Sequence, residues 1–169
     1  MPADYETGRR SLGELIKWYS TREGERNEAT TRLQLIDRIF FDCLGWSRES
    51  DVILEESRGR EYADYTFLAP RRVLIVEAKK EGDYFELPAG RTHLEYALPS
   101  LLRDYPKLKA AIEQAASYCQ ARGAPFGVVS NGHQIVAFIA TRNDGLPPLE
   151  GKALVFDTLQ CMLEHFFDL

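Results

Sequence analysis

Hydrophobic residues recur at helical spacing in two long segments of the chain. The first covers residues 28–44, where Asn27 is placed to cap the helix and Gly45 to end it. The second covers residues 107–122 and is followed by Gly123, a residue typical of helix C-termini. These two stripes predict the main helices of the protein.

Three further helices are predicted from shorter apolar patterns, within residues 5–23, near residues 94–102 and over residues 158–167. Phe166 and Phe167 stand near the C-terminus, and we expect both to be exposed. An exposed aromatic ending leads us to expect that the sequence is one domain of a longer protein.

Runs rich in β-branched and aromatic residues predict the strands. Residues 52–56, 61–68 and 73–79 are separated by turn-prone sequences and are expected to form an antiparallel meander. Two more strands, residues 126–130 and 134–140, are joined at Asn131-Gly132, a dipeptide that favours a two-residue type I′ turn. A last short strand is predicted near residues 153–156.

These elements predict an α/β fold with a mixed β-sheet of about five strands flanked by helices. A length of 169 residues and an apolar content of 44% fit a single domain. Within it we expect a catalytic core, residues 27–140, which contains an insertion at residues 82–106. An N-terminal extension, residues 1–26, precedes the core, and a C-terminal strand and helix, residues 150–169, follow it.

Charged residues at the ends of two predicted strands point to a site. If residues 69–72 form a four-residue loop, Leu68 faces Val73, and Asp64 lies directly across from Glu77. Lys79 shares a strand face with Glu77, and the Cβ atoms of Asp64 and Glu77 are then about 5 Å apart. Three charged side chains therefore converge on one patch.

Two opposed carboxylates repel each other unless something compensates them. A divalent cation does so, and hard oxygen ligands suit Mg²⁺ or Mn²⁺. Such a cation activates water and stabilises charge on a phosphate, and Lys79 beside it would orient the water or stabilise the transition state. The other interpretation is a salt-bridge cluster on a solvated sheet face.

The order and spacing of several segments resemble the PD-(D/E)xK nuclease superfamily. Within it, they resemble the N-terminal nuclease domain of the motor subunits of type I restriction enzymes, over roughly residues 26–140. The carriers are Asn27-Glu28-Ala29, Leu44-Gly45-Trp46, Tyr62-Ala63-Asp64-Tyr65, Val76-Glu77-Ala78-Lys79, Gln114-x-x-x-Tyr118 and Ser130-Asn131-Gly132. Ala63 departs from the pattern, because many members have proline there. The insertion, residues 82–106, is larger than a minimal core requires.

The resemblance implies a restriction-endonuclease-like core and a role for each matching residue. Asp64, Glu77 and the Ala78 carbonyl would bind the metal, and Lys79 would be the catalytic lysine. The resemblance also implies that Glu28 is an accessory acid. It further implies that Gln114 and Tyr118 form a helical Q-x-x-x-Y motif near the site. The alternative interpretation is that Glu28 only interacts favourably with the helix dipole, and that Gln114 and Tyr118 are an ordinary i, i+4 pair.

The implied activity is Mg²⁺-dependent endonucleolytic hydrolysis of DNA, in a restriction or anti-phage defence system. No Walker A sequence is present, so an ATPase or translocase module would be fused or associated. A net charge of −5 speaks against a stand-alone nucleic-acid binder and leaves open a catalytically silent binding or assembly module. RNA cleavage is a further alternative. Without a long apolar run or a signal sequence, we expect a cytoplasmic protein with no membrane partner.

Overall fold

The computed structural model describes residues 4–88 and 92–169. Parts of the predicted extension (residues 1–3) and insertion (residues 89–91) lie outside these ranges. The strands are β1 (Val52–Arg58), β2 (Glu61–Leu68), β3 (Arg72–Ala78), β4 (Glu95–Ala97), β5 (Phe126–Ser130), β6 (Ile135–Ile139) and β7 (Lys152–Phe156). The helices are α1 (Tyr5–Ser20), α2 (Glu28–Thr31), α3 (Leu98–Asp104), α4 (Pro106–Arg122) and α5 (Leu159–Glu164), with π-helical η1 (Arg32–Ile36) and η2 (Arg38–Cys43) and a 3₁₀ turn, η3 (Pro148–Glu150).

The strands form one mixed, open sheet in the order β1-β2-β3-β5-β6-β7-β4. β3 and β5 are parallel, and every other neighbouring pair is antiparallel. The predicted α/β class and the antiparallel β1-β2-β3 meander are therefore confirmed. The prediction of about five strands was wrong, because β7 pairs with β6 and β4 adds the edge strand beyond it; the sheet has seven strands.

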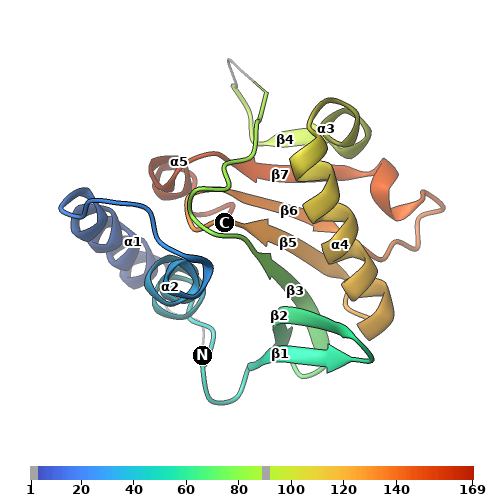
Figure 1. Cartoon of the computed structure of the whole chain (residues 1–169), viewed down its shortest axis with the longest axis horizontal. Helices are drawn as coiled ribbons and strands as arrows, with labels where there is room; N and C mark the ends of the chain where they lie inside the picture. The colour runs from blue at the N-terminus through green and yellow to red at the C-terminus, as the bar shows by residue number, and fades with distance from the viewer. Residues whose placement is uncertain (1–3, 89–91) are drawn as a thin grey trace.

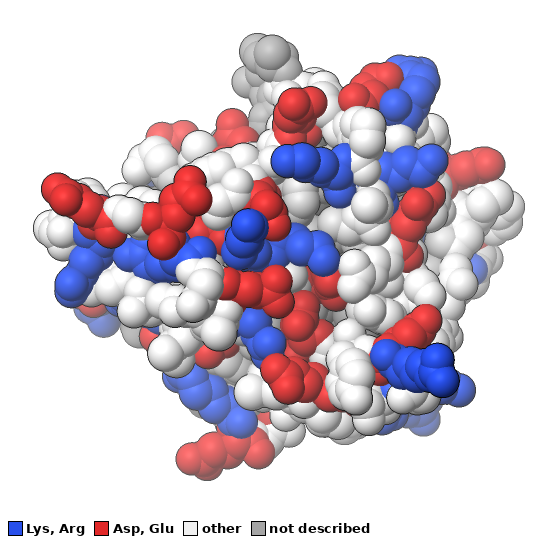
Figure 2. Space-filling model, in the orientation of Figure 1, with Lys and Arg blue, Asp and Glu red and all other residues white. Residues whose placement is uncertain are grey.

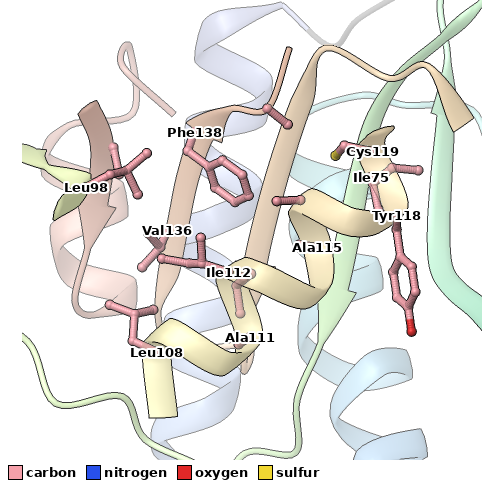
Figure 3. Close-up of a cluster of buried hydrophobic side chains, with 14 of the residues drawn as sticks. Ile75, Leu98, Leu108, Ala111, Ile112, Ala115, Tyr118, Cys119, Val136 and Phe138 are labelled. Carbon is pink, nitrogen blue, oxygen red and sulfur yellow. The ribbon is translucent and has the colours of Figure 1, made fainter. Parts of the chain in front are cut away.

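Helices cover both faces of this sheet (Figure 1). α4 lies across one face, where its buried stripe packs over β3 and β5 and reaches side chains of β6 (Figure 3). Ile112 and Ala115 on α4 lie beside Val136 and Phe138 in that cluster. The second core lies on the other face and is formed with α1, η1, η2 and α5. None of the helices in the two described ranges is both long and apolar enough to cross a membrane.

The helix predicted over residues 28–44 exists, but most of it is not α-helical. Asn27 caps α2 by accepting a hydrogen bond from the Thr30 amide at 2.8 Å, as predicted. Beyond Thr31 the chain is π-helical, and it closes with a hydrogen bond from the Leu44 amide to the Ile39 carbonyl five residues earlier, at 2.9 Å. The wider turn changes which residues face the sheet, because each turn holds more than 3.6 residues.

Three local predictions were wrong in detail. The segment near residues 94–102 begins with strand β4 and becomes helical only at Leu98. Ser130 pairs with Ile135, so the β5–β6 turn has four residues instead of a two-residue type I′ turn. Phe166 is buried against the ring of Tyr5, with centroids 5.6 Å apart, whereas Phe167 is exposed as expected.

Candidate active site

The pairing of β2 with β3 brings the predicted charged residues together. Tyr65 pairs with Val76 and Phe67 with Leu74, which is the register predicted from the sequence. The expected pairing of Leu68 with Val73 was wrong, because the register shifts after Phe67 and Leu68 pairs with Arg72. This irregularity lies at the loop end of the hairpin, so the predicted register still holds next to the charged residues.

Asp64 is fixed by the backbone of the strand opposite. Its Oδ2 accepts a hydrogen bond from the Ala78 amide at 2.8 Å, and its Oδ1 lies 3.5 Å from Nη1 of Arg32. Burial raises the pKa of Asp64, although the Ala78 amide and the Arg32 charge act in the opposite direction. The carboxylate is thus held in one orientation at the end of β3.

Glu77 is the most buried carboxylate of the site, with 3% of its surface exposed. Its Oε1 accepts a hydrogen bond from Nζ of Lys79 at 2.7 Å, whereas Oε2 is buried without a hydrogen-bond partner. Burial, helped by the charges of Asp64 and Glu28, raises the pKa of Glu77 to about 7. A buried oxygen of this kind costs free energy unless something binds to it.

Lys79 directly follows β3, and it makes hydrogen bonds to Glu77 of that strand and to Gln114 of α4. Its Nζ donates to Oε1 of Gln114 at 3.2 Å, and Nε2 of Gln114 donates to the hydroxyl of Tyr118 at 2.9 Å. In Figure 3 the Tyr118 ring carries its hydroxyl away from the apolar cluster under α4. The pair on α4 therefore belongs to a chain of contacts that ends on Lys79.

Glu28 stands at the first position of α2 and is exposed. It is near enough for its charge to raise the pKa of Glu77. Ala78 is buried at the end of β3, next to both carboxylates. The structure therefore gathers the predicted residues Glu28, Asp64, Glu77, Ala78, Lys79, Gln114 and Tyr118 around one end of β3.

The oxygen atoms around Glu77 decide whether the site can hold a divalent cation. Within residues 4–88 and 92–169, no three His, Cys, Asp or Glu side chains converge as a metal site. Asp64 and Glu77 nevertheless supply two carboxylates beside the Ala78 backbone, and Oε2 of Glu77 lacks a partner. Mg²⁺ takes few protein ligands and keeps several waters, so these residues fit such an ion.

Sequence reasoning missed Arg32, whose guanidinium lies beside Asp64. Nη1 of Arg32 is 3.1 Å from Oε1 of Glu55, and its Cζ lies 5.0 Å from the centre of the Tyr65 ring. The hydroxyl of Tyr65 in turn donates to Oδ1 of Asp37 at 2.6 Å. Arg32 stands four residues after Glu28 in the same helical segment, which is the signal that could have identified it.

A second missed group lies two residues beyond Lys79. Glu81 is buried, and its carboxylate accepts hydrogen bonds from the Arg26 side chain and amide, from the Tyr19 hydroxyl and from Nε2 of His133. Burial alone would raise the pKa of Glu81, but these hydrogen bonds lower it to about 2. His133, which the sequence presents as a turn residue, thus helps to hold the chain that follows the site.

A hollow of about 910 Å³ lies elsewhere, over an uncovered part of the sheet lined by apolar residues such as Leu74, Phe126 and Ile139. It includes none of the charged residues described above. The charged cluster is therefore a site at the end of a strand and no part of that apolar hollow.

No protein-family model, no curated protein and no solved structure matches this chain.

Proposed function

We propose that this protein is a metal-dependent nuclease of the PD-(D/E)xK type that hydrolyses DNA phosphodiester bonds internally with Mg²⁺ or Mn²⁺. The observation that carries the proposal is the buried Glu77 carboxylate, whose Oε2 has no partner, between Asp64 and Lys79. A salt-bridge cluster on a solvated face would leave both oxygens of each carboxylate in contact with cations or water. Burial of a carboxylate oxygen without a hydrogen-bond partner costs free energy, and a bound cation would offset that cost.

Asp64, Glu77 and the Ala78 carbonyl are the groups that would hold the ion. Such an ion, when bound, lowers the pKa of a water ligand and neutralises charge on the attacked phosphate. In the hydrolysis, the water oxygen forms a bond to phosphorus, one ester P–O bond breaks, and the leaving sugar oxygen takes up a proton. Lys79 is placed to orient the water or to stabilise negative charge on the phosphate oxygens.

The supporting contacts on α4 fit this assignment. Lys79 is held between Glu77 and Gln114, so its ammonium group is restricted in position before substrate arrives. Tyr118 restricts Gln114 in the same way. An exposed lysine without these contacts would lose more rotamer freedom on meeting a phosphate.

The surface charge bears on the substrate. The net charge is −5, yet Figure 2 shows acidic and basic side chains interleaved on this face, including over the region of α1. Basic side chains on this face permit contact with a phosphate backbone despite the acidic total. The resemblance to the nuclease domain of restriction motor subunits supports DNA as substrate, a role in restriction or anti-phage defence, and a fused or associated ATPase.

The test is cleavage of supercoiled plasmid with Mg²⁺, with Mn²⁺ and with EDTA. We expect metal-dependent nicking by the parent, loss of it in Asp64→Asn, and parental activity in Glu113→Gln, an exposed residue of α4. Equal cleavage by Asp64→Asn and the parent would refute the site. The same assay with an RNA substrate shows whether the protein cleaves DNA or RNA.

The acidic net charge favours one second candidate, a silent module that binds nucleic acid or assembles with a partner. Mobility shifts of DNA in Ca²⁺, which supports binding without hydrolysis, separate it from the first. Retardation in Ca²⁺ without cleavage in Mg²⁺ or Mn²⁺ would favour the silent module.

A further inference from the structure

Arg32 occupies a position that the proposed nuclease mechanism does not use. Its guanidinium lies 3.5 Å from Oδ1 of Asp64. The other oxygen of this carboxylate, Oδ2, accepts the hydrogen bond from the Ala78 amide. The side chain of Arg32 is only 16% exposed and that of Asp64 only 18% exposed. A largely buried cation thus lies beside the Asp64 oxygen that the Ala78 amide does not bind.

Arg32 has anchors that do not depend on Asp64. Glu55 holds Nη1 at 3.1 Å, and the Tyr65 ring faces the guanidinium. The hydroxyl of Tyr65 is itself fixed by Asp37. The guanidinium would therefore remain near the site after a cation had displaced it from Asp64.

The backbone of Glu55 supports this arrangement. Among the described residues, Glu55 is the one non-glycine residue with a positive φ, at 49°. It lies between the paired positions Leu54 and Glu56 of β1, opposite the segment of β2 that carries Asp64. Non-glycine residues adopt this conformation infrequently, and it occurs where surrounding contacts compensate for it.

The charges around the site leave an excess that matches one divalent cation. With Glu77 ionised, Glu28, Asp64, Glu77 and Glu55 contribute four negative charges, and Arg32 and Lys79 contribute two positive charges. The remaining two negative charges equal the charge of one Mg²⁺ or Mn²⁺ ion. Without Arg32 the excess would be three, and a divalent cation would be attracted more strongly.

We propose that Arg32 is a positioning residue that takes the place of the metal ion on Asp64 and sets how tightly a divalent cation binds there. It holds the carboxylate in position when the cation is absent, and its like charge lowers the affinity when the cation arrives. The inference rests on the proposed metal-dependent function and deepens it by naming the residue that controls metal loading.

The test measures Mn²⁺ binding directly, from the electron paramagnetic resonance signal of free Mn²⁺, in the absence of nucleic acid. A unit charge removed from about 6 Å in a water-like medium changes the affinity for a divalent cation about tenfold. We therefore expect Arg32→Gln to bind Mn²⁺ about tenfold more tightly than the parent. Arg32→Lys, which keeps the charge, is expected to stay near the parent.

Arg38→Gln is the matched control, because Arg38 lies in the next helical segment and contacts Trp18 and Asp42 instead of the site. Its affinity should equal that of the parent. A residue that only supported the fold would weaken metal binding when removed, so tighter binding by Arg32→Gln distinguishes the two roles. Equal or weaker binding by folded Arg32→Gln overturns the inference while leaving the nuclease proposal standing.

Glu55→Gln provides a second measurement if Arg32→Gln does not fold. Without the Glu55 charge, the guanidinium interacts more fully with Asp64, and we expect Mn²⁺ to bind several-fold more weakly. Unchanged affinity in Glu55→Gln would contradict the inference. Failure of the parent itself to bind Mn²⁺ at millimolar concentration would overturn the inference and the metal-dependent function together.

Discussion

The amide of Ala78 donates a hydrogen bond to Oδ2 of Asp64 at 2.8 Å. Because Ala78 follows Glu77 directly, this bond ties one candidate metal ligand to the backbone of the other. The Asp64 carboxylate is thus held against the backbone of β3. A cation that displaces Arg32 would therefore meet an Asp64 carboxylate that is already oriented.

Two substitutions of Asp64 should separate its charge from its hydrogen bond. Asp64→Asn keeps an oxygen that accepts from the Ala78 amide, and we expect its stability to remain close to that of the parent. Asp64→Ala leaves that amide unsatisfied and should lose about 1–3 kcal/mol in the free energy of unfolding. Both variants should lose Mn²⁺ binding and plasmid nicking. Urea unfolding without metal measures the first effect, and equal loss of stability in both variants would contradict it.

The raised pKa of Glu77 predicts that metal binding depends on pH. The cation requires the ionised carboxylate, whereas the metal-free protein holds a proton there below about pH 7. We expect close to one proton to be released for each Mn²⁺ bound at pH 6, and few at pH 8. Calorimetric titration in two buffers of different ionisation enthalpy measures the number, and an equal release at both pH values would exclude Glu77 as a titrating ligand.

The same shift predicts how the stability of the metal-free protein changes with pH. The pKa of Glu77 in the folded protein, about 7, lies above its ordinary value of 4.5. Its favourable contribution is therefore complete below pH 4.5 and is lost as the pH rises through 7. Thermal melts in EDTA should show this loss in the parent between pH 5 and 8. Glu77→Gln, which cannot titrate, should lack it.

The parts of the fold that the sequence predicts are those with strong periodicity and simple turn chemistry. The α4 stripe ends at Gly123, whose φ of 69° is the left-handed conformation expected of a helix C-terminus. The assumed loop at residues 69–72 predicts the observed register of β2 and β3 from Tyr65 to Phe67, although the register shifts between Phe67 and Leu68. That register is what brings Asp64 towards Glu77.

The features that sequence reasoning missed depend on side-chain contacts that the sequence pattern does not reveal, some local and some between distant segments. The β5–β6 turn is shaped by Oδ1 of Asn131, which accepts hydrogen bonds from the amides of His133 and Gln134. Nothing in a local Asn-Gly signal distinguishes this turn from the two-residue type. Likewise, the contact of Arg32 with Asp64 requires η1 to lie beside β2, and the burial of Glu81 requires the chain after β3 to pass between α1 and the turn.

The contacts from Lys79 through Gln114 to Tyr118 predict a graded loss of cleavage. On the proposed mechanism, Lys79→Ala removes the ammonium group beside the attacked phosphate, and we expect a loss of about 10²-fold to 10³-fold. Gln114→Ala only loosens Lys79 and should cost about tenfold, and Tyr118→Phe should stay within about threefold. Single-turnover nicking rates measure the series, with Gln120→Ala, an exposed residue of α4, as control. A loss in Tyr118→Phe as large as that in Lys79→Ala would show that the hydroxyl acts directly on the substrate.

The Glu81 cluster joins four segments of the chain immediately behind Lys79. Arg26 binds the carboxylate through its side chain at 2.9 Å, and the Glu81 amide donates to Oγ1 of Thr31 at 3.0 Å. The Lys79 amide is itself bonded to the Ser130 carbonyl at 2.8 Å. The main chain is thus fixed on both sides of the candidate catalytic lysine.

Removal of the Glu81 charge should therefore be costly and should change the response to acid. Glu81→Gln leaves Arg26 buried without its counter-ion, and we expect a loss of about 3–5 kcal/mol in the free energy of unfolding at pH 7.

Because the pKa of Glu81 is lowered to about 2, its contribution to stability is present above its ordinary pKa of 4.5 and is lost as the pH falls towards 2. Urea unfolding between pH 2 and 7 should thus show a steeper loss in the parent than in Glu81→Gln. Glu113→Gln, which removes an exposed carboxylate 3.8 Å from Lys109, should change stability by less than about 1 kcal/mol. Parallel curves for the parent and Glu81→Gln would mean that Glu81 does not carry its charge in the folded protein.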